Sequence, residues 1–541
     1  MPLLAISAVL LKNLRTSASE SKEQLLRLTD KGCADALRLL ALRYRAGNSF
    51  NGSRGWERRE NMVLNGLEPR RVFEIFEEIC NIPHGSGNME GISEYCIRFA
   101  RERELEVLRD AANNIVIRKN GSTGMEQLPP LIVQSHLDMV CAKEVFSDRD
   151  MSTEGLELFV QGDVIGAHRT SLGADDGIGV ALSLALLDHP KLKHPPLEIV
   201  LTADEETGMI GAQALDTSCL KGRRMISLDS EREGTFTIAC AGGMRVECSI
   251  PVSRKNFDGM TLDVTLDGLK GGHSGEEINS GRGNANKLLA RVLCSVAQKT
   301  DTRLCAFNGG EKENAIPRMA VATILVKSPS AAKDAIREQY EQMKKEYRST
   351  DDGIRIRTVE AGAGGKPLDE ESTKRALALL FSAINGVQMM STEIAGMVQL
   401  SLNMGVAATE NETISTCYTV RGASESQIAA AADQLAALTE ALGGQTKRSG
   451  TYPPWEYVAD TPLQKVVERV FLRQYGKKPV ILAIHGGIEC GLLSRKIPGL
   501  DCVCIGPDED GIHTPSERLH IASTKRVWDY LCSVVEECCD E

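Results

Sequence analysis

The sequence predicts an α/β protein in which helices flank a mixed, mostly parallel sheet and a second, α+β domain is inserted into the first. Three observations support this fold class. Short β-rich runs alternate with helical patterns in residues 62–246. Strands of alternating polarity, each followed by a helix, dominate residues 247–448, and buried-strand patterns return in residues 449–541. We therefore expect the last part of the chain to complete the first domain.

The first part of the chain carries the pattern that predicts the parallel sheet. Helical periodicity covers residues 68–82, 92–107 and 177–189, and strand patterns cover residues 113–119, 129–140, 197–206 and 223–231. The order strand, helix, strand, strand is typical of a mostly parallel sheet whose faces are covered by helices.

The inserted part and the closing part differ in their predicted strands and helices. In the inserted part, strands are predicted over residues 260–272 and 317–328, and helices over residues 284–299 and 331–347. In the closing part, residues 478–493 and 501–513 have the pattern of buried strands with loops at their ends.

Length and charge exclude several classes of protein. A chain of 541 residues is too long for one ordinary hydrophobic core, and 42% hydrophobic residues are enough to fill more than one. The net charge of -11 argues against a nucleic-acid partner. No apolar run approaches the roughly 20 residues that cross a bilayer, so we also expect no membrane partner.

The cysteines and the N-terminal segment indicate where in the cell the protein is expected. The 16 cysteines are irregularly spaced and form no CxxC pair, which suits reduced thiols in the cytoplasm. Residues 1–61 carry eleven Lys and Arg against six Asp and Glu, and their apolar run precedes the basic residues, unlike a secretory signal. We expect this segment to be an extension outside the folded core.

The stretch SLGADDGIGV, residues 171–180, places Asp175 and Asp176 among small and apolar residues. An ionised carboxylate removed from water costs several kcal/mol or more unless it is paired or bound to a cation. The two aspartates therefore indicate a site that holds positive charge.

Further polar residues fall at or just beyond the ends of predicted strands, where ligands bind in open α/β sheets. They are His136, Asp138, Glu205, Glu206, Asp229 and His513. Imidazole and carboxylate groups are ligands of zinc and similar divalent ions. The set is large enough for two ions joined by a bridging carboxylate, and one of the two adjacent aspartates is the predicted bridge.

Eight short motifs, in order along the chain, resemble one enzyme family. They are HLDMV (136–140), SLGADDGIG (171–179), TADEETGM (202–209), SLDSE (227–231), KGGHSGEEI (270–278), NAIPR (314–318), AIHGGIECGL (483–492) and HTPSE (513–517). From about Leu67 to the C-terminus the chain resembles the di-zinc aminopeptidase/aminoacylase superfamily. Within it, the chain is most similar to peptidase D, the family of aminoacyl-histidine (beta-alanyl-histidine) dipeptidases.

The resemblance implies a role for each candidate metal ligand. His136 and Asp229 would bind one Zn²⁺, Glu206 and His513 would bind the other, and Asp175 would bridge both. Zinc is the implied metal, two ions per chain, with Co²⁺ or Mn²⁺ as substitutes.

The resemblance also implies which residues act in catalysis. Glu205 would be the general base, and Asp138 would orient the imidazole of His136. A cis peptide bond is implied between Asp175 and Asp176, with Asp176 supporting the turn without binding zinc.

The inserted domain would be a lid and dimerisation domain that carries substrate-binding residues. His273 would reach the substrate of a partner subunit, Arg421 would clamp a substrate carboxylate, and Asn314 would be a further substrate contact. Alternatively, His273 is a turn residue and Arg421 an exposed charge at a strand end. His485 is expected only to shape the pocket.

These expectations lead to one predicted function and two alternatives. The predicted function is hydrolysis of dipeptides, of the Xaa-His type and of other dipeptides, by a cytoplasmic, homodimeric zinc enzyme with a zinc-exopeptidase-like catalytic domain. The alternative within hydrolysis is a carboxypeptidase or N-acyl amino acid deacylase on the same scaffold. The alternative outside enzymes is a non-catalytic, metal-dependent binding protein.

Overall fold

Two large sheets organise the residues that the computed structural model describes, which are 62–362 and 365–540. The predicted N-terminal extension, residues 1–61, lies outside the described residues. One sheet is built from both ends of the described chain, and the other is built from its middle. This is the arrangement expected of a domain with an insertion, and the predicted α/β fold class is confirmed.

The first sheet has eight strands in the order β1-β2-β6-β3-β7-β21-β8-β20. The strands are β1 (Glu106–Arg109), β2 (Ile115–Lys119), β3 (Leu131–His136), β6 (Leu197–Thr202), β7 (Arg224–Ser227), β8 (Thr235–Cys240), β20 (Val480–Ile484) and β21 (Asp501–Cys504). The pairs β3–β6, β3–β7, β7–β21 and β8–β20 are parallel, and the pairs at β1–β2, β2–β6 and β8–β21 are antiparallel. The sheet is therefore mixed and mostly parallel, as predicted.

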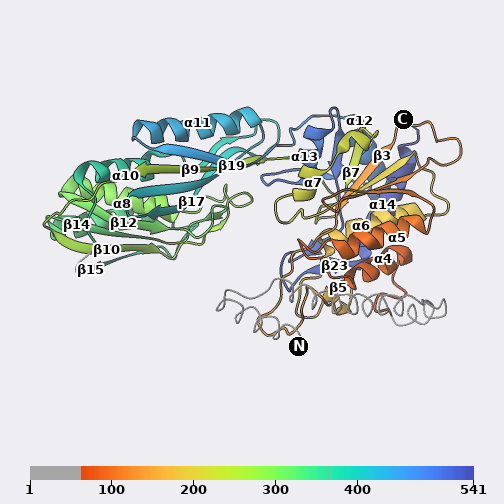
Figure 1. Cartoon of the computed structure of the whole chain (residues 1–541), viewed down its shortest axis with the longest axis horizontal. Helices are drawn as coiled ribbons and strands as arrows, with labels where there is room; N and C mark the ends of the chain where they lie inside the picture. The colour runs from red at the N-terminus through yellow and green to blue at the C-terminus, as the bar shows by residue number, and fades with distance from the viewer. Residues whose placement is uncertain (1–61, 363–364, 541) are drawn as a thin grey trace, which may run out of the picture. The chain divides into compact units, whose positions relative to one another are not determined.

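Helices pack on this sheet and complete its core. They are α4 (Arg70–Cys80), α5 (Glu90–Arg101), α6 (Ala174–Asp188), α7 (Ile210–Ala214), α12 (Pro462–Tyr475), α13 (Glu489–Lys496) and α14 (Ile521–Glu537), with a 3₁₀ turn at Thr217–Cys219. Figure 1 shows α4, α5 and α6 grouped on one side of β3 and β7. Helix α6 is buried along almost its whole length, because its residues are nearly all small or apolar.

Two predicted elements run into an element of another type. The predicted helix over residues 92–107 ends at Arg101, and the chain turns into the edge strand β1. The predicted strand over residues 478–493 stops at Ile484, and helix α13 begins at Glu489. The second boundary lies in the small and apolar stretch GGIECGLL, and periodicity does not distinguish strand from helix in such short runs.

The second sheet has nine antiparallel strands, eight of them in the order β15-β10-β14-β12-β17-β18-β9-β19, while β16 pairs with β17. The strands are β9 (Gly242–Pro251), β10 (Met260–Asp267), β12 (Thr302–Gly309), β14 (Ala320–Val326), β15 (Arg355–Glu360), β16 (Gly386–Met390), β17 (Val398–Thr409), β18 (Thr413–Gly422) and β19 (Gln445–Tyr452). The helices α8 (Ala285–Lys299), α9 (Pro329–Glu346), α10 (Glu370–Ser382) and α11 (Glu425–Ala441) share one hydrophobic core with it. The predicted domain boundaries at residues 247 and 448 fall within β9 and β19 and remain predictions.

The structure also contains two small sheets. Strands β11 (Gly272–His273) and β13 (Ala315–Ile316) pair with each other, and β4 (Leu158–Gln161), β5 (Val164–Ala167), β22 (Glu509–Asp510) and β23 (Arg518–His520) form a four-stranded sheet. These strands have two to four residues each, too few to show a periodic pattern in the sequence.

The parallel strands bring the candidate residues to one edge of the first sheet. His136, the last residue of β3, pairs with Thr202, the last residue of β6. Asp229 follows β7, and Glu205 follows β6. Because parallel strands end at the same edge, side chains from distant parts of the sequence meet there.

The described residues contain no candidate membrane span and no disulfide. Of the helices that the structure describes, none has the length and apolar character to cross a membrane. The described cysteines are free thiols, and most of them are buried.

Candidate metal centre

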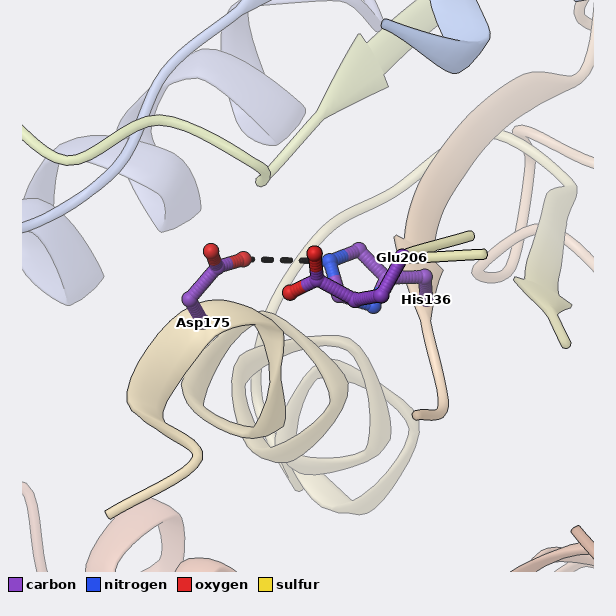
Figure 2. Close-up of side chains that lie close together, drawn as sticks. All are labelled: His136, Asp175 and Glu206. Carbon is purple, nitrogen blue, oxygen red and sulfur yellow. Dashed lines mark hydrogen bonds and ion pairs between the residues drawn. The ribbon is translucent and has the colours of Figure 1, made fainter. Parts of the chain in front are cut away.

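Imidazole and carboxylate groups converge on Asp175 at the carboxyl edge of the first sheet. Nε2 of His136 lies 3.0 Å from Oδ1 of Asp175. Nε2 of His513 lies 3.0 Å from Oδ2 of the same carboxylate and 2.8 Å from Oε1 of Glu206. Figure 2 shows His136 and Asp175 facing each other, with Glu206 beside them; one ligand atom from each of the three lies within 4.8 Å of the others. Each oxygen of Asp175 therefore faces a different imidazole, as a bridging carboxylate must.

Asp229 is the third acid of this cluster. Its Oδ1 lies 4.0 Å from Nε2 of His136, on the same ring atom that faces Asp175. Burial, together with the negative charge of Asp175, raises the pKa of Asp229 to about 7. The carboxyl group is thus placed where a nearby cation would stabilise its ionised form.

The ring of His136 is held in one orientation. Its side chain is buried, and its Nδ1 donates a hydrogen bond to the backbone carbonyl of Asp138 at 3.0 Å. This bond fixes the proton on Nδ1 and leaves the Nε2 lone pair directed at the carboxylates. The predicted ligand atom of His136 is therefore Nε2.

The carboxylate of Asp138 contacts the loop that carries two of the candidate residues. It accepts hydrogen bonds from the backbone N–H groups of Glu205, at 2.9 Å, and Glu206, at 3.2 Å, and from the hydroxyl of Ser86 at 2.8 Å. Its distance to Nδ1 of His136 is longer, 3.5 Å. Asp138 therefore holds the loop in place as well as lying beside the imidazole.

Glu205 and Glu206 are adjacent but differ in environment. The preceding residue, Asp204, has a φ of 53°, in the left-handed region, so the chain turns sharply before the pair. Glu206 points at His513. Burial raises the pKa of Glu205 well above its ordinary value, and the charges of Asp229 and Glu206 act in the same direction. A carboxyl group with a raised pKa suits proton transfer near neutral pH.

Asp176 lies behind the cluster and not in it. Its Oδ2 accepts a hydrogen bond from the backbone N–H of His136 at 3.0 Å, and its side chain is buried. The peptide bond between Asp175 and Asp176 is cis, as the sequence resemblance implies. The two neighbouring aspartates therefore have different surroundings.

The charge balance of the cluster fits metal cations. Among the described residues, no Lys or Arg forms an ion pair with Asp175, Glu206 or Asp229. Hydrogen bonds to Asp175 and Glu206 raise the pKa of His513 to about 10, which reflects a strong excess of negative charge. Three carboxylates and two imidazoles without a basic partner have the donor chemistry of a site for two divalent ions.

Sequence reasoning missed buried acids near this centre, and Glu489 and Glu517 are two of them. Glu489 is fully buried and accepts a hydrogen bond from Nε2 of Gln134 at 2.7 Å and another from the hydroxyl of Thr202. Burial raises its pKa to about 8. Its signal was an acid inside the small and apolar stretch GGIECGLL, the same signal that singled out the two aspartates. The second acid, Glu517, lies in the quoted motif HTPSE but had no assigned role.

The predicted substrate-binding residues form a second group. Arg421 is 8% exposed; its Nη1 donates to the hydroxyl of Tyr452 at 2.7 Å, and its Nε has no hydrogen-bond partner among the described residues. Burial and the charge of Arg421 lower the pKa of His273. His485 is also buried, with Nε2 2.7 Å from the hydroxyl of Ser401.

Asn314 and His273 lie on paired segments. The backbone carbonyl of Asn314 accepts a hydrogen bond from the N–H of Ser274 at 2.9 Å. Asn314 directly precedes strand β13, and Ser274 directly follows strand β11, which ends at His273 and pairs with β13. The side chain of Asn314 is exposed. The inserted domain thus presents a buried arginine, without a carboxylate partner among the described residues, close to two histidines.

Known proteins share this chain's sequence and fold. Residues 264–351 match the family model of a peptidase dimerisation domain of the M20 type. The cytosol non-specific dipeptidase of Escherichia coli is 37% identical over 480 residues, which are 88% of this chain and 99% of that protein. An aminoacylhistidine dipeptidase structure from Vibrio alginolyticus is 35% identical, with a TM-score of 0.82, covering 87% of this chain and 97% of that one. A tripeptidase from Staphylococcus aureus, 16% identical with a TM-score of 0.50, covers 88% of this chain and 100% of its own and shares the fold. The chain therefore belongs to the M20 family of peptidases, in the group that contains the cytosol non-specific and aminoacylhistidine dipeptidases.

Proposed function

We propose that this protein is a dipeptidase that works with two zinc ions. Membership of the family and the names of two relatives above 30% identity support dipeptide hydrolysis. One observation carries the metal part of the proposal. The two oxygens of Asp175 face the Nε2 atoms of two histidines that are 377 positions apart in the sequence, His136 and His513. A cation at each side of Asp175 would offset the several kcal/mol that burial of these carboxylates costs.

The donor set divides into two candidate sites. His136 and Asp229 would hold one ion, His513 and Glu206 would hold the other, and Asp175 would be shared. Two ions bound there would supply Lewis-acid activation of a water molecule and of the scissile carbonyl. Zinc suits two imidazole and three carboxylate donors, and Co²⁺ or Mn²⁺ would suit them as substitutes.

Proton transfer is assigned to Glu205. Its burial and its acidic neighbours raise the pKa of the carboxyl group, so it can accept a proton from the attacking water and later donate it to the departing amine. Asp138 fixes the loop of Glu205 through two backbone hydrogen bonds, which keeps the carboxyl group in reach during both transfers. Loss of the base would therefore affect turnover and not metal binding.

Substrate recognition is assigned to the inserted domain. The buried guanidinium of Arg421 has donors to spare, and a planar carboxylate is its natural partner. We infer that it binds the free carboxylate of a dipeptide, with His273 and Asn314 as neighbouring contacts. A carboxypeptidase or N-acyl amino acid deacylase would use the same carboxylate contact, so the substrate panel below has to separate these activities. The acids around Glu205 favour an enzyme over a binding protein, since binding alone needs no buried base.

The enzyme is proposed to act as a cytoplasmic homodimer. The matched dimerisation domain and the name of the cytosolic relative support this assignment. If His273 serves the partner's site, mixing His273→Ala with Glu205→Gln chains should restore activity in heterodimers, because one site then has both residues intact. Native mass measurement would confirm that heterodimers formed. No recovery in confirmed heterodimers would place His273 in the site of its own chain.

The function is tested with the purified full chain. Hydrolysis of Xaa-His and unrelated dipeptides, N-acyl amino acids and longer peptides is measured before and after chelation and after zinc is restored. We expect dipeptides to be cleaved best, activity to disappear with chelation, and zinc to restore it. Preference for N-acyl amino acids or for longer peptides would contradict the dipeptidase assignment, and activity that survives complete metal removal would contradict the metal centre.

A further inference from the structure

Glu517 is buried beside the candidate metal centre but is not one of its proposed ligands. Its side chain is 2% exposed. One oxygen, Oε2, accepts hydrogen bonds from the backbone N–H groups of Leu172, at 2.7 Å, and Gly173, at 3.0 Å. The other, Oε1, accepts from Ala174 at 2.8 Å and, at a longer 3.4 Å, from Asp175. A single carboxylate therefore takes the amides of four consecutive residues.

These four residues form the turn that presents the proposed bridge. Gly173 has a φ of 66°, and a β-carbon there would approach the sulfur of Met139 to 2.7 Å, so the turn is tight and suits only glycine. The four amides lie at the beginning of helix α6, where N–H groups have no partner within the helix. Without Glu517, these buried N–H groups would lose their shared acceptor, and the turn that positions Asp175 would lose the hydrogen bonds that hold it.

Glu517 also belongs to the segment that carries the other imidazole. It follows His513 by four residues, and the backbone N–H of Glu517 bonds to the carbonyl of Thr514 at 3.1 Å. The carboxylate thus joins the turn of Asp175 to the loop of His513, and these two residues face each other at 3.0 Å. The brace connects two ligand segments that are more than 300 residues apart in the sequence.

We propose that Glu517 is a positioning residue that sets the distance between the bridging Asp175 and His513, and thereby the affinity for the ion that these two residues share. This inference rests on the proposed two-ion centre. Groups that orient metal ligands typically contribute about 10- to 100-fold to metal affinity. A purely structural carboxylate, in contrast, would affect folding stability and leave metal affinity unchanged.

Glu198 offers a matched control. It is 3% exposed, and its carboxylate accepts hydrogen bonds from the backbone N–H groups of Lys221, at 3.0 Å, and Gly222, at 2.9 Å. It lies near the beginning of β6, whereas the metal centre lies at the end of that strand. Both buried glutamates thus accept hydrogen bonds from backbone N–H groups, and Glu198 has in addition Nε of Arg118 at 3.8 Å from its Oε1.

The experiment compares Glu517→Gln with Glu198→Gln. An amide has one accepting oxygen instead of two, so its NH2 group faces backbone N–H groups without a change in size. Glu517→Gln loses two of its four backbone bonds, and Glu198→Gln loses the second contact of Lys221, whose N–H reaches both oxygens. Zn²⁺ affinity is measured by competition with a chromogenic chelator, stability by thermal unfolding of the metal-free chains, and exposure of residues 170–180 by hydrogen exchange. Glu517→Asp, which keeps the charge but shortens the reach, is measured in parallel in case Glu517→Gln does not fold.

We expect Glu517→Gln to bind one ion at least about tenfold more weakly and to exchange the amides of residues 172–175 faster, while Glu198→Gln keeps the parental affinity for both ions. Parental affinity in a folded Glu517 variant would overturn the inference, as would an equal loss of affinity in Glu198→Gln. If the unsubstituted chain itself fails to bind two ions, the proposed metal centre fails, which is a different result.

Discussion

The two ends of helix α6 carry acids in opposite electrostatic settings. At its last residue, Asp188 accepts hydrogen bonds from Nε of Arg71 at 2.8 Å and Nη2 of Arg103 at 2.9 Å. At its beginning, Asp175 and Asp176 have no Arg or Lys partner among the described residues, and Asp175 faces only imidazoles. The carboxylate at the end of the helix is therefore neutralised by two arginines, whereas the negative charge at its beginning is not neutralised by any described Arg or Lys.

The helix dipole makes this contrast sharper. A carboxylate at a helix C-terminus is disfavoured, and the two arginines around Asp188 compensate for that cost. At the N-terminus the dipole favours negative charge, but its contribution of about 0.3 to 1 kcal/mol is small beside the several kcal/mol needed to bury a carboxylate. The proposed metal ions would balance the surplus negative charge around Asp175. On this helix, the acid far from the proposed metal centre has arginine partners, and the proposed bridging acid does not.

The largest expected effect comes from the acid that is assigned to proton transfer. Glu205→Gln keeps the shape of the side chain and removes its ability to accept a proton, so kcat should fall by about 10²- to 10⁴-fold. Metal analysis should still find two ions per chain, because Glu205 is not a proposed ligand. Loss of an ion in this variant would move Glu205 into the ligand set.

The next effect concerns the second ion. His513→Ala removes the imidazole that contacts both Asp175 and Glu206, so the metal content should fall from two ions per chain to one. Elemental analysis after dialysis against a metal-free buffer measures this directly. Two ions retained in the variant would exclude His513 as a ligand.

How far the sequence predicts these acids depends on whether their contacts are local. Asp175 and Asp176 stood out because two charges interrupt a small, apolar stretch. Helix α6 itself was predicted as residues 177–189 and found at Ala174–Asp188. The hydrogen bonds of Glu517 join residues more than 340 positions apart, and the local pattern of HTPSE does not predict them. Pairing of Asp188 with two arginines likewise depends on tertiary packing.

A smaller effect is expected at Glu489, the buried acid beneath the centre. It contacts Gln134, two residues before His136, and Thr202, three residues before Glu205. Glu489→Leu, which is similar in size, removes the oxygen that accepts both hydrogen bonds, so kcat should fall about tenfold with the metal content unchanged. Steady-state kinetics and metal analysis of the same preparation measure the two quantities. Unchanged kcat would show that the link supports only folding.

The smallest effect on catalysis is expected at the other end of α6. Although burial opposes it, hydrogen bonds from Arg103 and Arg71 lower the pKa of Asp188 below its ordinary value. Asp188→Asn should therefore destabilise the fold by about 1 to 2 kcal/mol at neutral pH and leave kcat of the folded enzyme unchanged.

The pH dependence of the stability lost in Asp188→Asn tests whether the ionised carboxylate of Asp188 stabilises the fold. A carboxyl group with a lowered pKa in the folded state stabilises the fold fully above its unfolded pKa of about 4, and this contribution is lost as the pH falls through the folded value. Urea unfolding of the metal-free chains should therefore show a difference between Asp188→Asn and the unsubstituted protein that is constant above about pH 5 and shrinks below about pH 4. Metal-free protein is needed because acid also protonates the proposed ligands. A fall in kcat at unchanged stability would mean that the acids at the two ends of α6 are coupled, and that the division between folding acids and catalytic acids does not hold for this helix.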